Sequence, residues 1–310
     1  RRARATLAGS AAAAVACMRQ ASTDVITIGV SNTPTIVQLN TLAGKTAGVV
    51  TATLAAASLS DLGSLDTAAT DVITVTVNDA DNAAVTAANL STLGGKTAGT
   101  VTVTNAVVIS GTPAEVTAAL VTAGTKVEVS AATVTVSGNP TITQLNNIAA
   151  ETTGAVTATL AAASLSDLGS LDTAATDVIT VTVNDADAAA VTAANLSTLG
   201  GKTAGTVTVT NAVVISGDHD QLTAALVTAG TKVSVSDAKV TVSDADATAI
   251  TAAELSDIGS STTGQVTVTN AVAITGTAAE VTAALVTAGS LVVVSAVSYT
   301  HLTLPTIYSV

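Results

Sequence analysis

Aromatic residues are almost absent from this chain, whose 310 residues include no Phe, no Trp and only two Tyr. Hydrophobic residues still make up 48% of it, so Ala, Val, Leu and Ile must form any core. A globular core usually gains much of its buried area from aromatic side chains. A solenoid does not need them, because each coil buries its face on its neighbours. The lack of Trp and Phe also argues against a carbohydrate-active solenoid enzyme, which would need aromatic platforms beside clustered carboxylates.

Cysteine and arginine are scarce as well. The single cysteine, Cys17, excludes a disulfide framework and a cysteine-based metal site. All four arginines lie within the first 19 residues, and the whole chain carries six Lys against 22 acidic residues, for a formal charge of -12. This acidic balance argues against nucleic acid and anionic lipid as partners. Thr, Ser and Asp interrupt every apolar segment before it reaches the ~20 residues of a membrane span.

One long stretch occurs twice. Residues 50–111 return at 156–217 with a single change, Asn82 to Ala188, at an offset of 106 residues. Equivalent valines of successive β-type runs recur at intervals of 25 to 31 residues, at Val50, Val75, Val101, Val129, Val156, Val181, Val207, Val235, Val266 and Val292. The duplicated block is therefore four coils of about 26 residues, within the ~20–29 range of strand-plus-helix repeats.

Each β-type run alternates strictly. In 101–104, Val101 and Val103 point to one face and Thr102 and Thr104 to the other. Several runs continue into a second one, as in 105–110 and 131–136, which predicts two short strands joined at a corner. The other strands are expected at 24–28, 50–53, 72–77, 126–129, 156–159, 178–183, 207–210, 232–235, 266–269 and 291–294.

Short helices are predicted between the strands. Thr112 and Glu115 form a capping-box pattern around Pro113, a favourable first helical residue. The pairs Asp218/Gln221 and Thr277/Glu280 repeat this pattern, and Thr33-Pro34 and Asn139-Pro140 indicate two further starts. Apolar residues at helical spacing predict about three turns, ending at Gly124, Gly230 and Gly289.

A strand, a helix and a second strand of the same sheet make a parallel, right-handed crossover. The sequence therefore predicts an α/β fold, a right-handed α/β solenoid with a parallel β face on one side and short helices on the other. We expect these repeats to span residues 24–296.

The two ends differ from the repeats. Residues 297–310, VSYTHLTLPTIYSV, hold both tyrosines and resemble a translated sequencing adaptor, so we expect a non-native tail there. Residues 1–23 match no repeat, and truncation, a frame error and a weak signal-like segment ending at Cys17 are the alternatives.

The repeats resemble those of giant bacterial secreted and cell-surface proteins, the RTX-type adhesins and cyanobacterial repeat proteins. The phrases that carry this resemblance are VTVNDA at 181–186, TAANL at 192–196 and TAAL at 223–226. It implies a non-enzymatic segment of a much longer protein, whose partners are neighbouring repeats and a cell-surface or matrix component. The GGxGxD calcium motif of RTX proteins is absent from this sequence.

Three aspartate pairs are the candidate metal ligands. Each pair stands where a predicted strand gives way to a helix, and two carboxylates so placed could join carbonyl oxygens around Ca²⁺. The alternative is that they cap the helix and complement its dipole. The six residues are Asp79, Asp81, Asp185, Asp187, Asp244 and Asp246.

Outward threonines suggest a second binding hypothesis. Stacked Thr-x-Thr pairs would form ranks like those of ice-binding solenoids, although Thr is also simply a good strand former. The pairs are Thr74/Thr76, Thr102/Thr104, Thr157/Thr159, Thr180/Thr182, Thr208/Thr210 and Thr267/Thr269.

His219 is the only histidine of the repeats, between Asp218 and Asp220. It could serve as a general base, but the equivalent positions are Pro113 and Ala278, which predicts a solvated surface residue. We identify no catalytic or cofactor-binding residue. The expected function is a non-catalytic structural repeat segment of an extracellular or cell-surface bacterial protein, with a calcium- or ice-binding module as the alternative.

Overall fold

The computed structural model describes residues 5–7, 25–125, 127–231, 233–287, 289 and 292–295. The expected tail 297–310 and the stretch 1–23, apart from 5–7, thus lie outside the described residues. The described part is a mixed α/β structure of parallel strands and short helices. It divides into two compact units, Arg1–Ala161 with Leu171–Ile179 and Ala162–Ser170 with Thr180–Val310. The division falls within β10 (Val178–Val183).

The strands of unit 1 form parallel ladders in which neighbours lie about one repeat length apart along the chain. The paired residues are 21 apart in Thr51–Val72 and 26 apart in Val75–Val101. One ladder runs β1–β2–β3–β4–β6 and another β5–β7–β8–β9. Their bounds are β1 (Ala5–Leu7), β2 (Ile28–Val30), β3 (Val50–Thr53), β4 (Val72–Val77), β5 (Ala84–Thr86), β6 (Val101–Val103), β7 (Val108–Gly111), β8 (Thr133–Val136) and β9 (Val156–Thr159).

Unit 2 repeats this arrangement. β10 pairs with β12 and β12 with β14, while β11, β13, β15, β17 and β19 follow one another in a second ladder, and β16 pairs with β18. All these pairs are parallel. The bounds are β11 (Ala190–Thr192), β12 (Val207–Val209), β13 (Val214–Gly217), β14 (Ser234–Val235), β15 (Lys239–Val242), β16 (Ala249–Thr251), β17 (Val266–Val268), β18 (Ala273–Thr275) and β19 (Val292–Val294).

The predicted alternation of Val and Thr is confirmed. Val101 and Val103 are at most 2% exposed, whereas Thr102 between them is half-buried. Small and medium aliphatic side chains fill the core. The largest fully buried ones are Leu39, Leu62, Ile73, Leu90, Ile109, Leu120, Leu145, Ile148, Leu168, Ile179, Leu196 and Ile215. The aromatic-free composition therefore suffices for a continuous buried interior in each unit.

The strand predicted at 126–129 forms only a bridge, from Thr102 to Glu128. The Val127 N–H donates to the carbonyl of Ala119, in the preceding helix, at 2.7 Å, so it does not bond to the neighbouring strand. Glu128 does pair with that strand, since its N–H donates to Val101 and its carbonyl accepts from Val103.

The predicted capping boxes are confirmed at Thr112/Glu115, Asp218/Gln221 and Thr277/Glu280. Hydrogen bonds from the Thr112 backbone and hydroxyl lower the pKa of Glu115 from its ordinary value.

The two proline-marked helices begin two residues later than expected, after the caps Thr35 and Thr141. The helices are α2 (Ile36–Ala43), α3 (Leu59–Leu62), α4 (Ala87–Gly94), α5 (Pro113–Leu120), α6 (Ile142–Ala149), α7 (Leu165–Leu168), α8 (Ala193–Gly200), α9 (His219–Leu226), α10 (Ala252–Ser260) and α11 (Ala278–Leu285).

The predicted helix ends at Gly124, Gly230 and Gly289 are wrong. α5, α9 and α11 end at Leu120, Leu226 and Leu285, so they have about two turns. In α5, the Thr122 backbone and hydroxyl both donate to the Thr117 carbonyl, and the Thr125 hydroxyl donates to the Ala118 carbonyl. The Thr117 carbonyl also accepts from the Val121 N–H, and the Thr125 hydroxyl satisfies the Ala118 carbonyl, so the helix ends before the glycine is reached.

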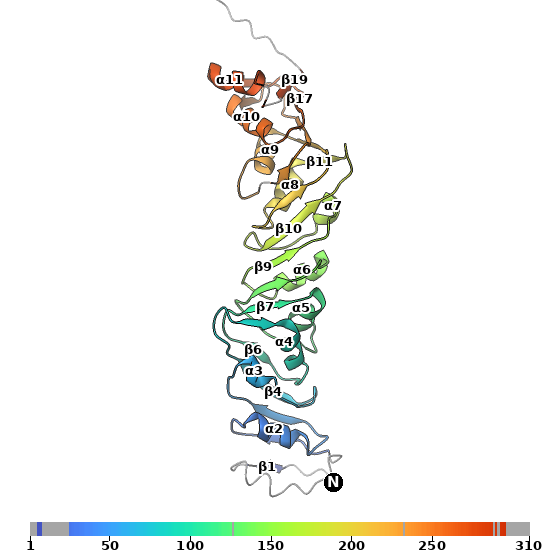
Figure 1. Cartoon of the computed structure of the whole chain (residues 1–310), viewed down its shortest axis with the longest axis vertical. Coiled ribbons are helices and arrows are strands. Elements are labelled where there is room, and N and C mark those ends of the chain that lie inside the picture. Colours follow the sequence, from blue (N-terminus) through green and yellow to red (C-terminus); the bar gives the residue numbers. More distant parts are fainter. Residues whose placement is uncertain are drawn as a thin grey trace, which may run out of the picture. The chain divides into compact units, whose positions relative to one another are not determined.

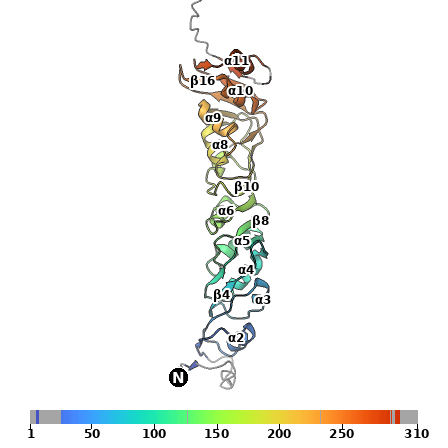
Figure 2. The ribbon, with the colours of Figure 1, turned by 90° about the vertical axis from the view of Figure 1, so that its left-hand side faces the viewer.

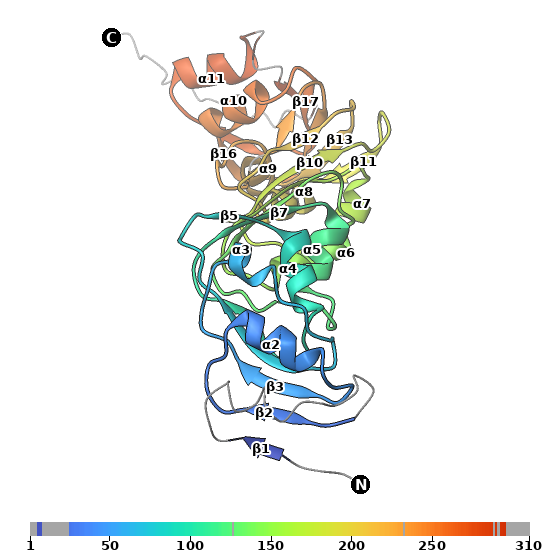
Figure 3. The ribbon, with the colours of Figure 1, turned by 60° about the horizontal axis from the view of Figure 1, so that its bottom comes forward.

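Successive helices pack on one another within each unit. α4 contacts α5 and α5 contacts α6 in unit 1, and α8, α9, α10 and α11 follow in the same way in unit 2 (Figure 1). Figure 2 shows the α8 to α11 succession from the side. Near the N-terminus, α2 covers β3, which lies beside β2 (Figure 3). Helices this short are marginal alone in water, so their stability must come from this packing.

The one residue that differs between the two long copies adopts a left-handed backbone conformation. Asn82 has φ 62°, Ala188 has φ 61°, and the related Ala247 has φ 63°. Asn tolerates this region much better than Ala does, because its side chain can bond locally. The first copy thus carries the better-suited residue at this turn.

We expect the substitution Ala188→Asn to raise the free energy of unfolding by about 0.5–1 kcal/mol, because it relieves the left-handed alanine. The reverse change, Asn82→Ala, should lower it by a similar amount. Urea titrations followed by far-UV circular dichroism measure both. Equal stability of both variants and the parent chain would contradict this account of the turn.

Candidate functional site

The first aspartate of each predicted pair binds a helix one segment earlier in the chain. The Asp79 Oδ2 accepts from the N–H of Leu59, the first residue of α3, at 2.7 Å. Asp185 does the same for Leu165 of α7 at 2.7 Å. Asp244 accepts from the N–H of His219, the first residue of α9, at 2.8 Å. Each carboxylate therefore satisfies a free donor and complements the positive end of an earlier helix.

The second aspartate of each pair reaches the following segment. The Oδ1 atoms of Asp81, Asp187 and Asp246 accept from the N–H groups of Ala106, Ala212 and Ala271, at 2.9, 3.1 and 2.9 Å. Side-chain amides reinforce these links by donating to the carbonyl of the first aspartate at 2.6, 2.6 and 2.5 Å, from Asn105, Asn211 and Asn270.

These contacts revise the capping alternative of the sequence analysis. The helices that follow the pairs are capped by Thr86, Thr192 and Thr251 instead. The aspartates cap an earlier helix and a later loop, which sequence spacing alone did not indicate. Within the described residues, no three His, Cys, Asp or Glu side chains form a group that could hold a metal ion. Calcium binding by the six aspartates stays a prediction.

His219 is not the solvated residue that the sequence predicted. Its side chain is only 15% exposed, and its Nδ1 lies 2.6 Å from the Oδ1 of Asp244, whose side chain is 4% exposed. Its Nε2 lies 3.5 Å from the exposed carboxylate of Asp220. Burial of the ring lowers its pKa, but the hydrogen bond that the ring donates to Asp244 and the charges of Asp244, Asp220 and Glu254 together raise the pKa above its usual value of 6.5.

Two buried carboxylates were not predicted from the sequence. Asp71 and Asp177 are 3% and 4% exposed. Asp71 accepts from the N–H of Val50 and of Ala68, both at 2.8 Å. Asp177 accepts from Val156 at 2.7 Å and from Ala174 at 2.8 Å. The signal that could have revealed them is the recurring phrase TAATDV, in which the aspartate directly precedes the apolar alternation.

A recurring Thr-x-Gly phrase is a second feature that the sequence analysis did not identify. The Thr97 hydroxyl is buried, accepts from the N–H groups of Ile73 and Gly99 at 2.7 and 2.8 Å, and lies 2.9 Å from the carbonyls of Asp71 and Ile73. A Cβ on Gly99 would stand 2.3 Å from the Ile73 carbonyl oxygen. The phrase recurs at Thr46, Thr152, Thr203 and Thr262, and in each the threonine oxygen accepts from the glycine two residues on.

The outward threonines lie in register, as expected from the pattern. Thr76 pairs with Thr102 in one unit, and Thr182 with Thr208 in the other. Some of their hydroxyls are already engaged, since Thr104, Thr210 and Thr269 donate to the carbonyls of Val77, Val183 and Val242. Ice binding stays a prediction.

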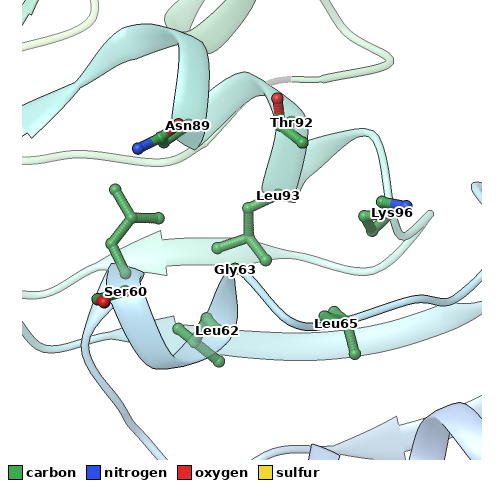
Figure 4. Close-up of a pocket in the computed structure, with 9 residues that line it drawn as sticks. Ser60, Leu62, Gly63, Leu65, Asn89, Thr92, Leu93 and Lys96 are labelled. Carbon is green, nitrogen blue, oxygen red and sulfur yellow. The ribbon is translucent and has the colours of Figure 1, made fainter.

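A shallow pocket lies between α3 and α4, with a volume of about 270 Å³. Figure 4 shows Leu93 of α4 above Gly63 and Leu62, with Lys96 at one side (Figure 4). The Lys96 Nζ is 3.3 Å from the Oδ1 of Asp66, and the Asp66 side chain is 82% exposed. This exposed ion pair contributes little to stability. Four of the nine residues that line the pocket are core leucines, namely Leu59, Leu62, Leu65 and Leu93.

No protein-family model, no curated protein and no solved structure matches the chain. Among the described residues, no helix combines the length and the apolar character needed to cross a bilayer.

The polar side chains described above share one chemical use. Asp79, Asp71 and Thr97 all satisfy backbone groups of a segment 20 to 26 residues away. Bonds of this kind hold successive segments together because buried backbone donors and acceptors need partners. His219 is the exception, because its imidazole binds a side chain, the carboxylate of Asp244, and not a backbone group.

Proposed function

We propose that the chain is a right-handed α/β solenoid of about 26-residue coils and acts as a non-catalytic structural segment. We place it in a secreted or cell-surface bacterial protein of the adhesin-like kind, with a parallel β face on one side and short helices on the other. Its partners are then neighbouring repeats of the same protein and a component of the cell surface or matrix.

The observation that carries this proposal is the strand register. Within each unit, strands pair in parallel with strands 21 to 26 residues further on, as in Thr51–Val72 and Val240–Val266. A chain that returns to the same position once per repeat is what a solenoid requires. The duplication fits as well, because adding whole coils changes the length of such a structure without rebuilding its core.

The use of the polar side chains supports a structural function. The conspicuous carboxylates, Asp71, Asp79 and Asp244, accept hydrogen bonds from backbone N–H groups of earlier segments. Their repetition is explained by the repetition of the coil. The acidic surface is consistent with a location outside the cell.

Deleting a whole number of coils tests the proposal. Removal of residues 50–155 joins Val49 to Val156 and takes out 106 residues, one full offset of the duplication. Because Val156 occupies the place of the buried Val50, we expect a folded protein with an unchanged circular dichroism signal per residue and a cooperative urea transition.

The matched control removes one residue more. Deletion of residues 50–156 joins Val49 to Thr157, so that every following side chain of that strand turns to the opposite face. We expect its free energy of unfolding to be lower by about 3 kcal/mol or more, because Thr replaces Val in the core. Equal stability of the two deletion variants, or unfolding of both, would overturn the solenoid proposal.

A further inference from the structure

His219 is the first residue of a helix whose start is bound by an aspartate from a later segment, and two other helices of this kind begin with leucine. The first helical residues bound by Asp79, Asp185 and Asp244 are Leu59, Leu165 and His219. In all three, a carboxylate oxygen accepts from the backbone N–H of that residue. Only in the third does the side chain of the same residue engage the second carboxylate oxygen, with Nδ1 and Oδ1 2.6 Å apart.

Among the described residues, the charged groups that face this imidazole are all acidic. Asp244 comes from the loop after β15, Asp220 from α9 itself, and Glu254 from α10, which packs on α9. Asp218, the cap of α9, adds a further carboxylate at the same helix end. A protonated imidazole neutralises part of this charge. A neutral imidazole leaves it unbalanced, with the Asp244 carboxylate 4% exposed.

We propose that His219 and Asp244 form a pH-dependent clasp, which ties the start of α9 to the following segment more strongly when the imidazole is protonated. A neutral imidazole can still donate from Nδ1, so the clasp weakens rather than opens fully. The ionic form is stronger because the positive charge of the imidazolium adds a Coulomb attraction to the Asp244 carboxylate, which accepts the hydrogen bond in both states. This inference rests on the local geometry and does not depend on the proposed function.

The direction of the pH effect follows from the raised pKa of His219. A group whose pKa is higher in the folded than in the unfolded state contributes stability that is complete below its unfolded pKa, 6.5. This stability is lost as the pH rises through the folded value. The region around α9 should therefore become less stable between mildly acidic and mildly basic pH.

Amide hydrogen exchange of the full chain tests the clasp. After correction for the intrinsic exchange rate, the protection of the α9 amides should fall on the order of three- to tenfold between about pH 5.5 and about pH 8.5. The amide of Leu165, bound by Asp185 without a histidine, serves as the internal control and should keep its protection. Without a pH effect at α9, or with an equal effect at Leu165, the proposal is wrong.

The variant His219→Gln separates the imidazole from the backbone link. Its backbone N–H can still bind Asp244, so the helix cap is kept, and the pH dependence at α9 should disappear. A pH dependence that persists in this variant would assign the effect to the carboxylates alone. In a second experiment, the Asp244→Asn substitution should lower the imidazole pKa measured by NMR. An unchanged imidazole pKa in that folded variant would also refute the clasp.

Discussion

Replacing Gly99 by alanine should destabilise the chain by about 3 kcal/mol or more, a loss at the upper end of the range for overpacked sites. The new Cβ would stand 2.3 Å from the Ile73 carbonyl oxygen and 2.6 Å from its carbonyl carbon. Both atoms belong to the backbone of a paired strand, so no side-chain rotation can relieve the contact. The two segments would have to separate, which would also break the hydrogen bonds of Thr97.

A matched control lies nearby in the same unit. Gly124 is exposed, and a Cβ there would meet nothing within 4 Å. Gly124→Ala should therefore leave stability unchanged or raise it by less than about 1 kcal/mol. Far-UV circular dichroism in urea is the appropriate probe, because no Trp is present and the tyrosines lie beyond residue 298. A Gly99→Ala variant as stable as Gly124→Ala would show that the close approach of the two segments is not needed.

Asp71→Ala should cost about 2–5 kcal/mol, because it leaves the buried N–H groups of Val50 and Ala68 without their acceptor. Asp71→Asn should cost less than the alanine change, since the amide oxygen can still accept one of the two hydrogen bonds. The second copy offers a repeat of the same experiment. Asp177 holds Val156 and Ala174 in the same way, so Asp177→Ala should cost a similar amount.

Asp257→Ala is the control for charge removal, because Asp257 is an exposed aspartate of α10. It should change stability by no more than about 0.5 kcal/mol. Urea titration gives the free energies, and hydrogen exchange at the Val50 amide reports the local effect. If the buried and the exposed aspartates proved equally dispensable, the two hydrogen bonds of Asp71 would carry no net stability.

The sequence predicted the local elements well because their signals are local. Alternation placed the strands at Val101 and Val266, and the capping box placed the start of α5 at Pro113. Helix ends were missed because they depend on Thr122 and Thr125, whose side chains return to the last turn from beyond it. Gly124 indicated the end of the helix, but the helix ends at Leu120, where the threonine hydrogen bonds begin.

The polar links could not be predicted because their partners lie 20 or more residues away. The spacing of Asp79 and Asp81 indicated a cap for the next helix, whereas their acceptor oxygens serve Leu59 and Ala106. Likewise, nothing in the local sequence connects His219 with Asp244, 25 residues later. Only the parallel register, which sets one segment beside the next, brings these residues together.

Most of these side chains reach backward along the chain. Asp71 binds Val50, Thr97 binds Ile73, and Asn105 binds Asp79. During synthesis the earlier segment leaves the ribosome first, so each new segment meets a partner that is already present. Because chains emerge at about 5–20 residues per second, a segment of about 26 residues would dock every few seconds. Folding can then proceed as a vectorial, one-directional addition that keeps pace with translation.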